Sequence, residues 1–402
     1  MSMRERFLSY IKIDTQSDPY SDTCPSSDKQ LVLSRLLFDQ LKDMGLDPLL
    51  KDGYVYASID SNLDKRVKSV GFIAHVDTSF DFSGFNVKPR VISNYDGSDI
   101  YLNDKLVLDI KNFSELARFI GDDIVVTDGS TLLGADDKAG VTIIMEMVKF
   151  IVENPMVKHG DIKICFTPDE EIGRGADLFD IEYFGADFAY TIDGGLVDQF
   201  CYETFNAYAL NVDIKGVMIH PGSGKDKLVN AIGLGNEFDS LLPKDKRPEF
   251  TSGYEGFNHL VSIKGSSEYC HMEYIVRNHS YDLILKQLED FERIRDFINS
   301  KYGYGAIVLD YSLSYRNMFD KLKDEKEVLD IGLKAIKDEG MEVKIVNARG
   351  GTDGSRLTFM GLPCPNIGTG GINFHGPYEC CSLNQMEIAK RVLLNIIREV
   401  SK

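Results

Sequence analysis

The sequence predicts an α/β protein with one domain built on a mixed, mostly parallel sheet flanked by helices, and a smaller ferredoxin-like α+β domain inserted into it. Two observations support this prediction. Strand-like and helical segments alternate before residue 207 and again after residue 317, as in open α/β sheets. Between these positions the order is strand, helix, two strands, helix, strand, which is the ferredoxin-like order. We therefore expect a first domain at residues 1–206 and 318–402 and an inserted domain at residues 207–317.

The individual elements follow from the spacing of apolar residues. Helical spacing predicts helices at residues 4–13, 29–44, 114–120, 136–151, 228–241, 281–299, 324–339 and 384–400. Apolar or alternating runs predict strands at residues 54–59, 67–74, 161–166, 188–192, 207–214, 306–315 and 342–347, with two more within residues 261–275. Apart from its one helix, the passage 79–130 is rich in Asn, Asp and Gly and is expected to be irregular.

The composition is that of an ordinary globular protein with an acidic surface. The 402 residues are 43% hydrophobic and 27% charged, and the formal net charge is −18, which disfavours nucleic acid or an anionic membrane as a partner. No apolar run approaches the roughly 20 residues that span a bilayer, and no apolar segment follows the charged start, so we expect neither a membrane helix nor a secretion signal. The seven cysteines show no pairing pattern, which favours a reduced, cytoplasmic protein.

Three of the predicted strands lead into acidic residues or a histidine. These residues are His75 and Asp77 after strand 67–74, Glu170 and Glu171 after strand 161–166, and Asp193 after strand 188–192. Open α/β sheets bind their ligands at the carboxyl ends of strands, so these side chains are candidates for one site. Taken singly, each has an ordinary alternative, because a histidine can be a loop residue and an acidic run is often a solvated loop.

Two further acids, Asp136 and Asp137, begin the predicted helix after Gly134. Helix capping and the helix dipole both favour anions there, which is one explanation for the pair. Two consecutive acids exceed what a cap needs, so one of them is also a candidate ligand. Near the C-terminus, His375 lies in a glycine-rich stretch without the Lys-Ser/Thr ending of a phosphate-binding loop, and we interpret it as a candidate metal ligand.

Together these residues form a set of two imidazoles and three carboxylates. The set is His75, Asp136, Glu171, Asp193 and His375. Nitrogen and oxygen donors in this proportion suit two zinc-like ions with one shared carboxylate, about 3.5–4 Å apart in two-metal hydrolases. Glu170 would then remain free as a proton acceptor, and Asp77 lies two residues from His75, on the same side of the chain, where it could orient the imidazole.

The motifs that carry these residues resemble the peptidase T family, the tripeptide aminopeptidases of the zinc-dependent aminoacylase and carboxypeptidase clan. They include Ala-His-Val-Asp-Thr at 74–78, Leu-Gly-Ala-Asp-Asp-Lys-Ala-Gly at 133–140, Asp-Gly-Gly at 193–195 and His-Pro-Gly at 220–222. Further similar stretches are residues 166–175, 253–257, 315–318, 350–356 and 374–376. The resemblance therefore extends through nearly the whole chain.

The resemblance implies how the two metals would be held. His75, Asp136 and Asp193 would bind one ion, while Asp136, Glu171 and His375 would bind the second, so that Asp136 bridges them. The metals would be two divalent ions per subunit, with zinc the expected element.

The resemblance also implies the roles of the remaining parts. Glu170 would be the general base, Asp77 would orient the first histidine, and the peptide bond between Asp136 and Asp137 would be cis. The inserted domain would be a lid and dimerisation domain, giving a homodimer that acts on small peptides.

Five further residues are expected to contact the substrate. They are His220, Asn230, Arg277, Arg349 and Arg356. His220 would donate a hydrogen bond to the oxyanion, and a dimer would allow it to act on the partner subunit. The arginines are candidates for binding the far carboxylate of a tripeptide, with Asn230 as a polar helper. Each arginine has an alternative in a surface or interdomain ion pair, and His220 has one as a solvent-exposed residue at the end of a strand.

Two departures and two competing functions accompany this resemblance. Arg-Asn-His-Ser at 277–280 stands where the family has Arg-Asp-Phe-Asp, and Phe80 stands where a proline is usual. The nearest alternative function is a dipeptidase or N-acyl amino acid deacylase of the same clan. An alternative from another class is a catalytically silent, metal-containing peptide-binding protein. Glu170 argues against the second alternative, because a structural site needs no unliganded base.

Overall fold

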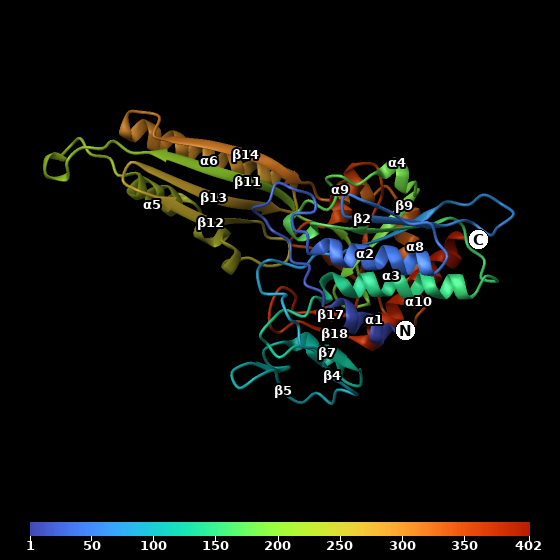
Figure 1. Cartoon of the computed structure of the whole chain (residues 1–402). Helices are drawn as coiled ribbons and strands as arrows, with labels where there is room; N and C mark the ends of the chain where they lie inside the picture. Colours follow the sequence, from blue (N-terminus) through green and yellow to red (C-terminus); the bar gives the residue numbers. More distant parts are fainter. The chain divides into compact units, whose positions relative to one another are not determined.

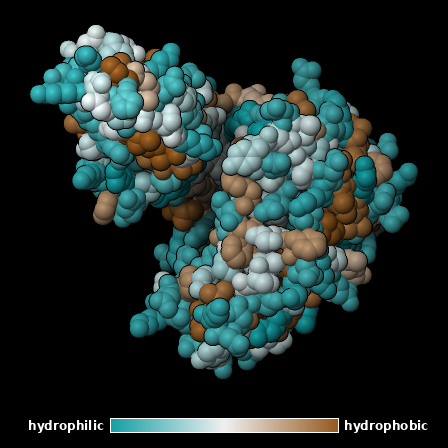
Figure 2. Space-filling view, turned by 60° about the vertical axis from the view of Figure 1, so that its left-hand side comes forward, coloured by the Kyte–Doolittle hydropathy of each residue, from teal (hydrophilic) through white to brown (hydrophobic).

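The computed structural model describes all 402 residues, which fold into two compact units (Figure 1). Unit 1 comprises Met1–Tyr202, Lys321–Val346 and Thr352–Lys402, and unit 2 comprises Glu203–Asp320 and Asn347–Gly351. The segment 207–317, expected to be an inserted domain, lies within unit 2. No helix combines the length and apolar character needed to cross a bilayer, and hydrophilic residues cover most of the surface between scattered apolar patches in Figure 2.

An eight-stranded mixed sheet forms the centre of unit 1. Its strands, in spatial order, are β1 (Leu49–Lys51), β2 (Tyr54–Ile59), β8 (Ile162–Thr167), β3 (Val70–His75), β9 (Phe188–Gly194), β16 (Asn366–Gly368), β10 (Gln199–Glu203) and β15 (Lys344–Asn347). The pairs β8–β3, β3–β9 and β9–β16 are parallel, whereas β2 and β10 run antiparallel to their inner neighbours. The predicted α/β class is therefore confirmed, with the parallel strands at the centre of the sheet.

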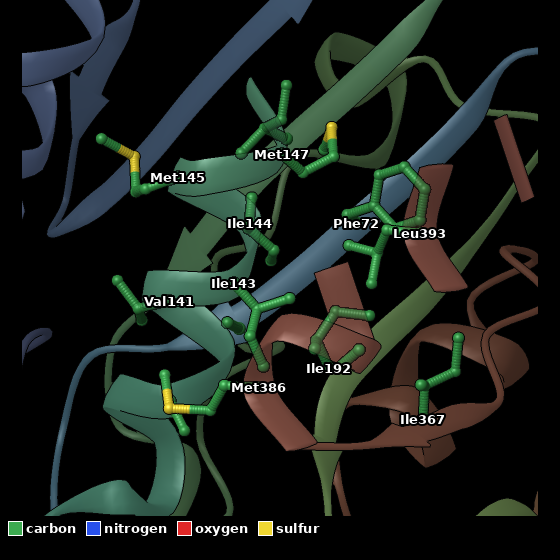
Figure 3. Packing of buried hydrophobic residues seen from close by; sticks show 14 of the residues in the cluster. Phe72, Val141, Ile143, Ile144, Met145, Met147, Ile192, Ile367, Met386 and Leu393 are labelled. Atoms are coloured by element: carbon green, nitrogen blue, oxygen red, sulfur yellow. The ribbon is translucent and has the colours of Figure 1, made fainter. Parts of the chain in front are cut away.

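Helices flank this sheet and enclose an apolar core. They are α1 (Met3–Tyr10), α2 (Gln30–Asp43), α3 (Ala135–Glu153), α4 (Ile181–Phe184), α7 (Phe319–Leu322), α8 (Lys326–Lys337), α9 (Asp353–Phe359) and α10 (Leu383–Val400). α3 packs against β3, β9, α1 and α10, so almost all of its faces are buried. In Figure 3, Ile143 and Ile144 of α3 lie among Phe72, Ile192 and Leu393 from three other elements.

The passage 79–130 contains more structure than the sequence indicated. It holds β4 (Arg90–Ile92), β5 (Ile100–Tyr101), β6 (Val107–Leu108), the 3₁₀-helix η1 (Ser114–Phe119) and β7 (Ile124–Val126). β7 pairs with β4 and with β18 (Cys380–Ser382), which in turn pairs with β17 (Gly371–Ile372). The expectation of an irregular passage was wrong because strands of two or three residues are too short to show alternation, and β18 lies far away in the sequence.

Unit 2 is an antiparallel sheet covered by two helices. Its elements, in chain order, are β11 (Asn206–Lys215), α5 (Ala231–Leu241), β12 (Phe257–Gly265), β13 (Tyr269–Asn278), α6 (Tyr281–Tyr302) and β14 (Ile307–Tyr315). The spatial order is β12-β13-β11-β14, with every pair antiparallel. Alternate residues of β13, such as Met272 and Tyr274, join the core formed with α5 and α6. This is the ferredoxin-like arrangement that the element order predicted.

Candidate active site

His75 is the last residue of β3, at the carboxyl end of the parallel strands. Its side chain is buried, with 2% exposed. Nε2 lies 3.0 Å from Asp136 Oδ1 and 3.7 Å from Asp193 Oδ1. Nδ1 lies 3.2 Å from Asp77 Oδ1. The imidazole therefore has one nitrogen close to two candidate metal ligands. Its other nitrogen lies close to the carboxylate of Asp77 and 3.1 Å from the backbone carbonyl oxygen of the same residue.

His375 approaches the same aspartate from a loop. Its φ is 63°, a left-handed conformation that is uncommon outside glycine, and its side chain is 40% exposed. Nε2 lies 3.3 Å from Asp136 Oδ2 and 3.0 Å from Glu171 Oε2. The two oxygens of Asp136 thus face the two histidines separately, which is the arrangement of a bridging carboxylate.

Asp137, the next residue, accepts hydrogen bonds from the backbone beside Asp136. The peptide bond between Asp136 and Asp137 is cis. Oδ2 of Asp137 accepts the His75 N–H at 3.2 Å, and Oδ1 accepts the Gly140 N–H at 3.1 Å. A Cβ at Gly140 would stand 1.9 Å from the Ile192 carbonyl oxygen, so only glycine allows this close approach. Asp137 also belongs to a possible metal-binding group with His75 and Asp193, but both its oxygens already accept backbone N–H groups.

Asp77 connects the first histidine to the two glutamates. Its Oδ1 accepts the Glu170 N–H at 3.0 Å and its Oδ2 accepts the Glu171 N–H at 3.1 Å. The side chain is fully buried. One carboxylate therefore lies beside the His75 ring and also accepts the backbone N–H groups of both glutamates. The contact with the glutamates was not part of the sequence prediction.

Negative charge is concentrated at this site, and the pKa values of its groups reflect the crowding. Burial alone would raise the pKa of Asp136, but hydrogen bonds with the two histidines hold it below its ordinary value. Burial raises the pKa of Glu171 to about 8 and that of Asp193 to about 6. Burial and the nearby charge of Asp193 raise the pKa of Glu170 well above its ordinary value. Carboxylates this close repel one another, and a cation would relieve the repulsion.

The site's donors fit a divalent metal. Ligand atoms of His75, Asp136 and Glu171 lie within 4.8 Å of one another. Oε1 of Glu171 is buried and has no hydrogen-bond partner, although buried carboxylate oxygens normally have one. A cation would satisfy this oxygen, and imidazole with carboxylate is the ligand combination of zinc and similar ions.

The predicted substrate-binding residues belong to both units. His220, Asn230, Arg277 and Arg349 lie in unit 2, and Arg356 lies in unit 1. Asn230 caps α5 by accepting the N–H groups of residues 232 and 233 through its Oδ1. Arg356 donates to the Gly173 carbonyl oxygen at 2.9 Å and pairs with Asp177, so it supports the loop after the two glutamates.

Two carboxylates at the site were not foreseen from the sequence. Oδ2 of Asp81 lies 3.2 Å from Nδ1 of His375. The Asp77 carboxylate has the same position relative to Nδ1 of His75. Glu379 is buried and accepts backbone N–H groups from the loop that leads to Asp136. The only sequence indication was proximity, since Asp81 follows Asp77 by four residues and Glu379 follows His375 by four.

Comparison with known proteins shows the family of this chain. The family model of peptidase family M20/M25/M40 matches residues 128–399. Proteins named peptidase T from Bacillus licheniformis and Clostridium perfringens are each 47% identical to this chain over 398 residues. The alignments span 98% of this chain in both cases, and 97% and 98% of those proteins, respectively. The chain belongs to the peptidase T family. Peptidase T of Bacillus subtilis is 45% identical over 399 residues, with 98% of this chain and 97% of that protein covered.

Solved structures show that the peptidase T family fold extends over the entire chain. The aminopeptidase PepT of Bacillus cereus has a TM-score of 0.78 at 19% identity, covering 100% of this chain and 98% of that one. A tripeptidase of Staphylococcus aureus has a TM-score of 0.79 at 22% identity, covering 99% and 98%. A dinuclear metal-binding M20 peptidase of Bacillus subtilis is more distant, with a TM-score of 0.66 at 13% identity, covering 99% and 97%.

Proposed function

We propose that this peptidase is a tripeptide aminopeptidase that uses two divalent metal ions, expected to be zinc. The observation that carries the proposal is the position of Asp136, whose two oxygens face His75 and His375 separately. Near-complete alignment with proteins named peptidase T supports the peptide substrate.

The residues that would hold the metals divide into two sets. His75, Asp136 and Asp193 would hold one ion, and Asp136, Glu171 and His375 would hold the other. When bound, such ions polarise a carbonyl oxygen and lower the pKa of coordinated water to about 7.

Glu170 is the proposed general base. Its neighbour Glu171 faces His375, whereas Glu170 is not among the proposed ligands. Burial raises the pKa of Glu170, which strengthens it as a proton acceptor. Glu170 takes a proton from the attacking water and returns it to the departing amine. Its backbone, held by Asp77, keeps the carboxylate in place between these two transfers.

His220 is the proposed donor to the oxyanion. Its Nδ1 accepts the Gly222 N–H at 3.2 Å. The neutral ring therefore carries its proton on Nε2, so the tip of the side chain is a hydrogen-bond donor. This tautomer is the one that stabilisation of an oxyanion requires. In the proposed homodimer, His220 would act on the partner subunit, with unit 2 as the lid and dimerisation domain.

Arg277 is the strongest of the three candidates for binding the substrate carboxylate. Arg349 already donates to the carbonyl oxygens of Gly253 and Glu255, each at 2.8 Å, and also to Thr251. Arg356 is similarly engaged in unit 1. Arg277 donates from Nη1 to the Arg349 carbonyl oxygen at 3.2 Å, while its Nε is buried without a partner. The guanidinium of Arg277 is thus the least engaged of the three, and a guanidinium can bind a carboxylate through two parallel hydrogen bonds.

The test compares four substrates with the metal-loaded protein. They are a free tripeptide, its N-acetylated form, the matching dipeptide and a tetrapeptide, with products identified by mass spectrometry. Release of one N-terminal residue from the free tripeptide alone is the expected result. Cleavage of the acetylated form, or preference for the dipeptide, would instead support a deacylase or dipeptidase. No cleavage with any divalent metal would support a catalytically silent peptide-binding protein.

A further inference from the structure

Three backbone N–H groups, two in the loop before α3 and one in its first turn, converge on one buried carboxylate. Glu379 Oε2 accepts the Leu133 N–H at 2.6 Å and the Gly134 N–H at 2.9 Å. Glu379 Oε1 accepts the Asp136 N–H at 3.1 Å. Glu379 is only 1% exposed. A buried carboxylate is costly unless its oxygens are hydrogen-bonded, and here both oxygens accept N–H groups from one segment, residues 133–136.

The shape of the loop explains why an anion fits there. Gly134 has a φ of 78° and a ψ of 28°, a left-handed conformation that glycine adopts without strain. Left-handed residues in such turns direct neighbouring N–H groups towards one point, forming a concave site for an anion. The side chain of Glu379 is the anion at this point, so the contact is built into the fold.

The position of Glu379 in the chain connects this contact to both halves of the candidate metal site. Glu379 lies four residues after His375, whereas the loop it holds leads directly into Asp136. Asp136 and His375 approach each other to 3.3 Å. The carboxylate of Glu379 thus joins the segment that carries the bridging ligand to the segment that carries the second histidine.

We propose that Glu379 is a positioning residue that sets the distance between the bridging carboxylate of Asp136 and the imidazole of His375. It acts through these two residues and contacts neither substrate nor metal. Without it, the N–H of Asp136 loses its acceptor and the two segments can separate. The ion held by Asp136, Glu171 and His375 is then bound more weakly. This inference rests on the proposed two-metal function.

The first test is metal binding rather than catalysis. Metal-free wild-type protein and Glu379→Gln are titrated with Zn²⁺ against a chromophoric chelator, well below the unfolding temperature. The amide of glutamine retains one acceptor oxygen and presents an NH₂ group to the N–H groups on the other side. We expect one of the two Zn²⁺ ions to bind about 10- to 100-fold more weakly, the range typical of groups that orient metal ligands. Glu342→Gln, the same change at an exposed position, is the matched control and should bind as wild type.

A second variant separates position from charge. Glu379→Asp keeps the negative charge but withdraws the oxygens by one methylene. If Glu379 acts by reach, as proposed, Glu379→Asp also weakens one ion. Binding of both ions by folded Glu379→Asp and Glu379→Gln with wild-type affinity would overturn the proposal.

A measurement on the unaltered chain covers the case in which neither variant folds. Hydrogen exchange of the metal-free wild type should show slow exchange for the amides of Leu133, Gly134 and Asp136, because each donates to Glu379. Fast exchange at these amides would refute the proposal without any variant. Failure of the proposed two-metal function can be distinguished from failure of the role proposed for Glu379. A wild type that binds fewer than two ions would overturn the two-metal function itself, whereas unchanged variants would overturn only the role of Glu379.

Discussion

The two histidines of the candidate site make matching contacts in different surroundings. Each directs Nε2 at Asp136 and Nδ1 at a second carboxylate. His75 ends a central strand and its partner Asp77 is fully buried, whereas His375 lies on a loop and the side chain of its partner Asp81 is 56% exposed. Buried contacts are screened less by solvent and are held more rigidly than exposed ones. The same ligand pattern is therefore built with two different degrees of rigidity, and we expect the His375 side to hold its metal less tightly.

The largest expected effect is a loss of catalysis without any change in metal binding. Glu170→Gln removes the proposed base but none of the proposed ligands. We expect kcat to fall by about 10²–10⁴-fold, the usual contribution of a general base. Metal content, measured by elemental mass spectrometry, should remain that of wild type. Turnover equal to wild type would remove Glu170 from the mechanism, and loss of metal would make it a ligand.

A change on the His75 side should have the next largest effect. Asp77→Ala removes the orienting carboxylate and leaves the N–H groups of Glu170 and Glu171 without acceptors. We expect about 10- to 100-fold lower kcat/KM and a lower Tm, since each unsatisfied buried N–H costs about 1–3 kcal/mol. The exposed Asp60→Ala is the control. An Asp77→Ala protein with wild-type activity and Tm would show that the buried Asp77 carboxylate contributes neither to catalysis nor to stability.

Removal of metal by a chelator tests directly whether the His375 side holds its metal less tightly than the His75 side. We expect the two ions to leave in two steps, with the first lost at a chelator activity about tenfold lower than the second. His375→Ala should abolish the easily removed step and keep the other. If His375→Ala instead retained the easily removed ion, the order of the two sides would be reversed.

The smallest effect is expected at Asp81. Asp81→Asn keeps one oxygen that can accept from Nδ1 of His375, and the position is open to solvent. We expect a loss of metal affinity below about tenfold, measured by the same chelator titration. An effect as large as that of Asp77→Ala would mean that exposure does not decide the contribution of these carboxylates.

The predictable part of the site consists of residues at the ends of regular elements. β2 has the bounds that alternation predicted. The ends of β3, β8 and β9 lie one or two residues beyond the predicted ends, so that His75 and Asp193 are the last and the next-to-last residues of their strands, whereas Glu170 follows β8. These strands are long enough to show a pattern, and their ends share one edge of the sheet. The separate positions of the two Asp136 oxygens could not be read from any pattern, but a bridging role was implied by family resemblance.

The unpredictable part consists of contacts between distant segments. Asp81 meets His375 across 294 positions, and Glu379 meets Leu133 across 246. No local spacing records such pairs, because each depends on how loops close after the sheet has formed. The same applies to Arg349, whose carbonyl contacts lie about a hundred positions away, at Gly253 and Glu255.

The place of β16 in the central sheet has a consequence for biosynthesis. β16 lies between β9 and β10 although it comes from the last tenth of the chain, after unit 2 has been made. Roughly 180 residues separate Asp193 from His375, which at about 5–20 residues per second is a delay of about 10–40 s during translation. Throughout this interval the nascent chain has His75, Asp136, Glu171 and Asp193 but not the second histidine. The chain therefore acquires the complete candidate ligand set only after unit 2 has been translated.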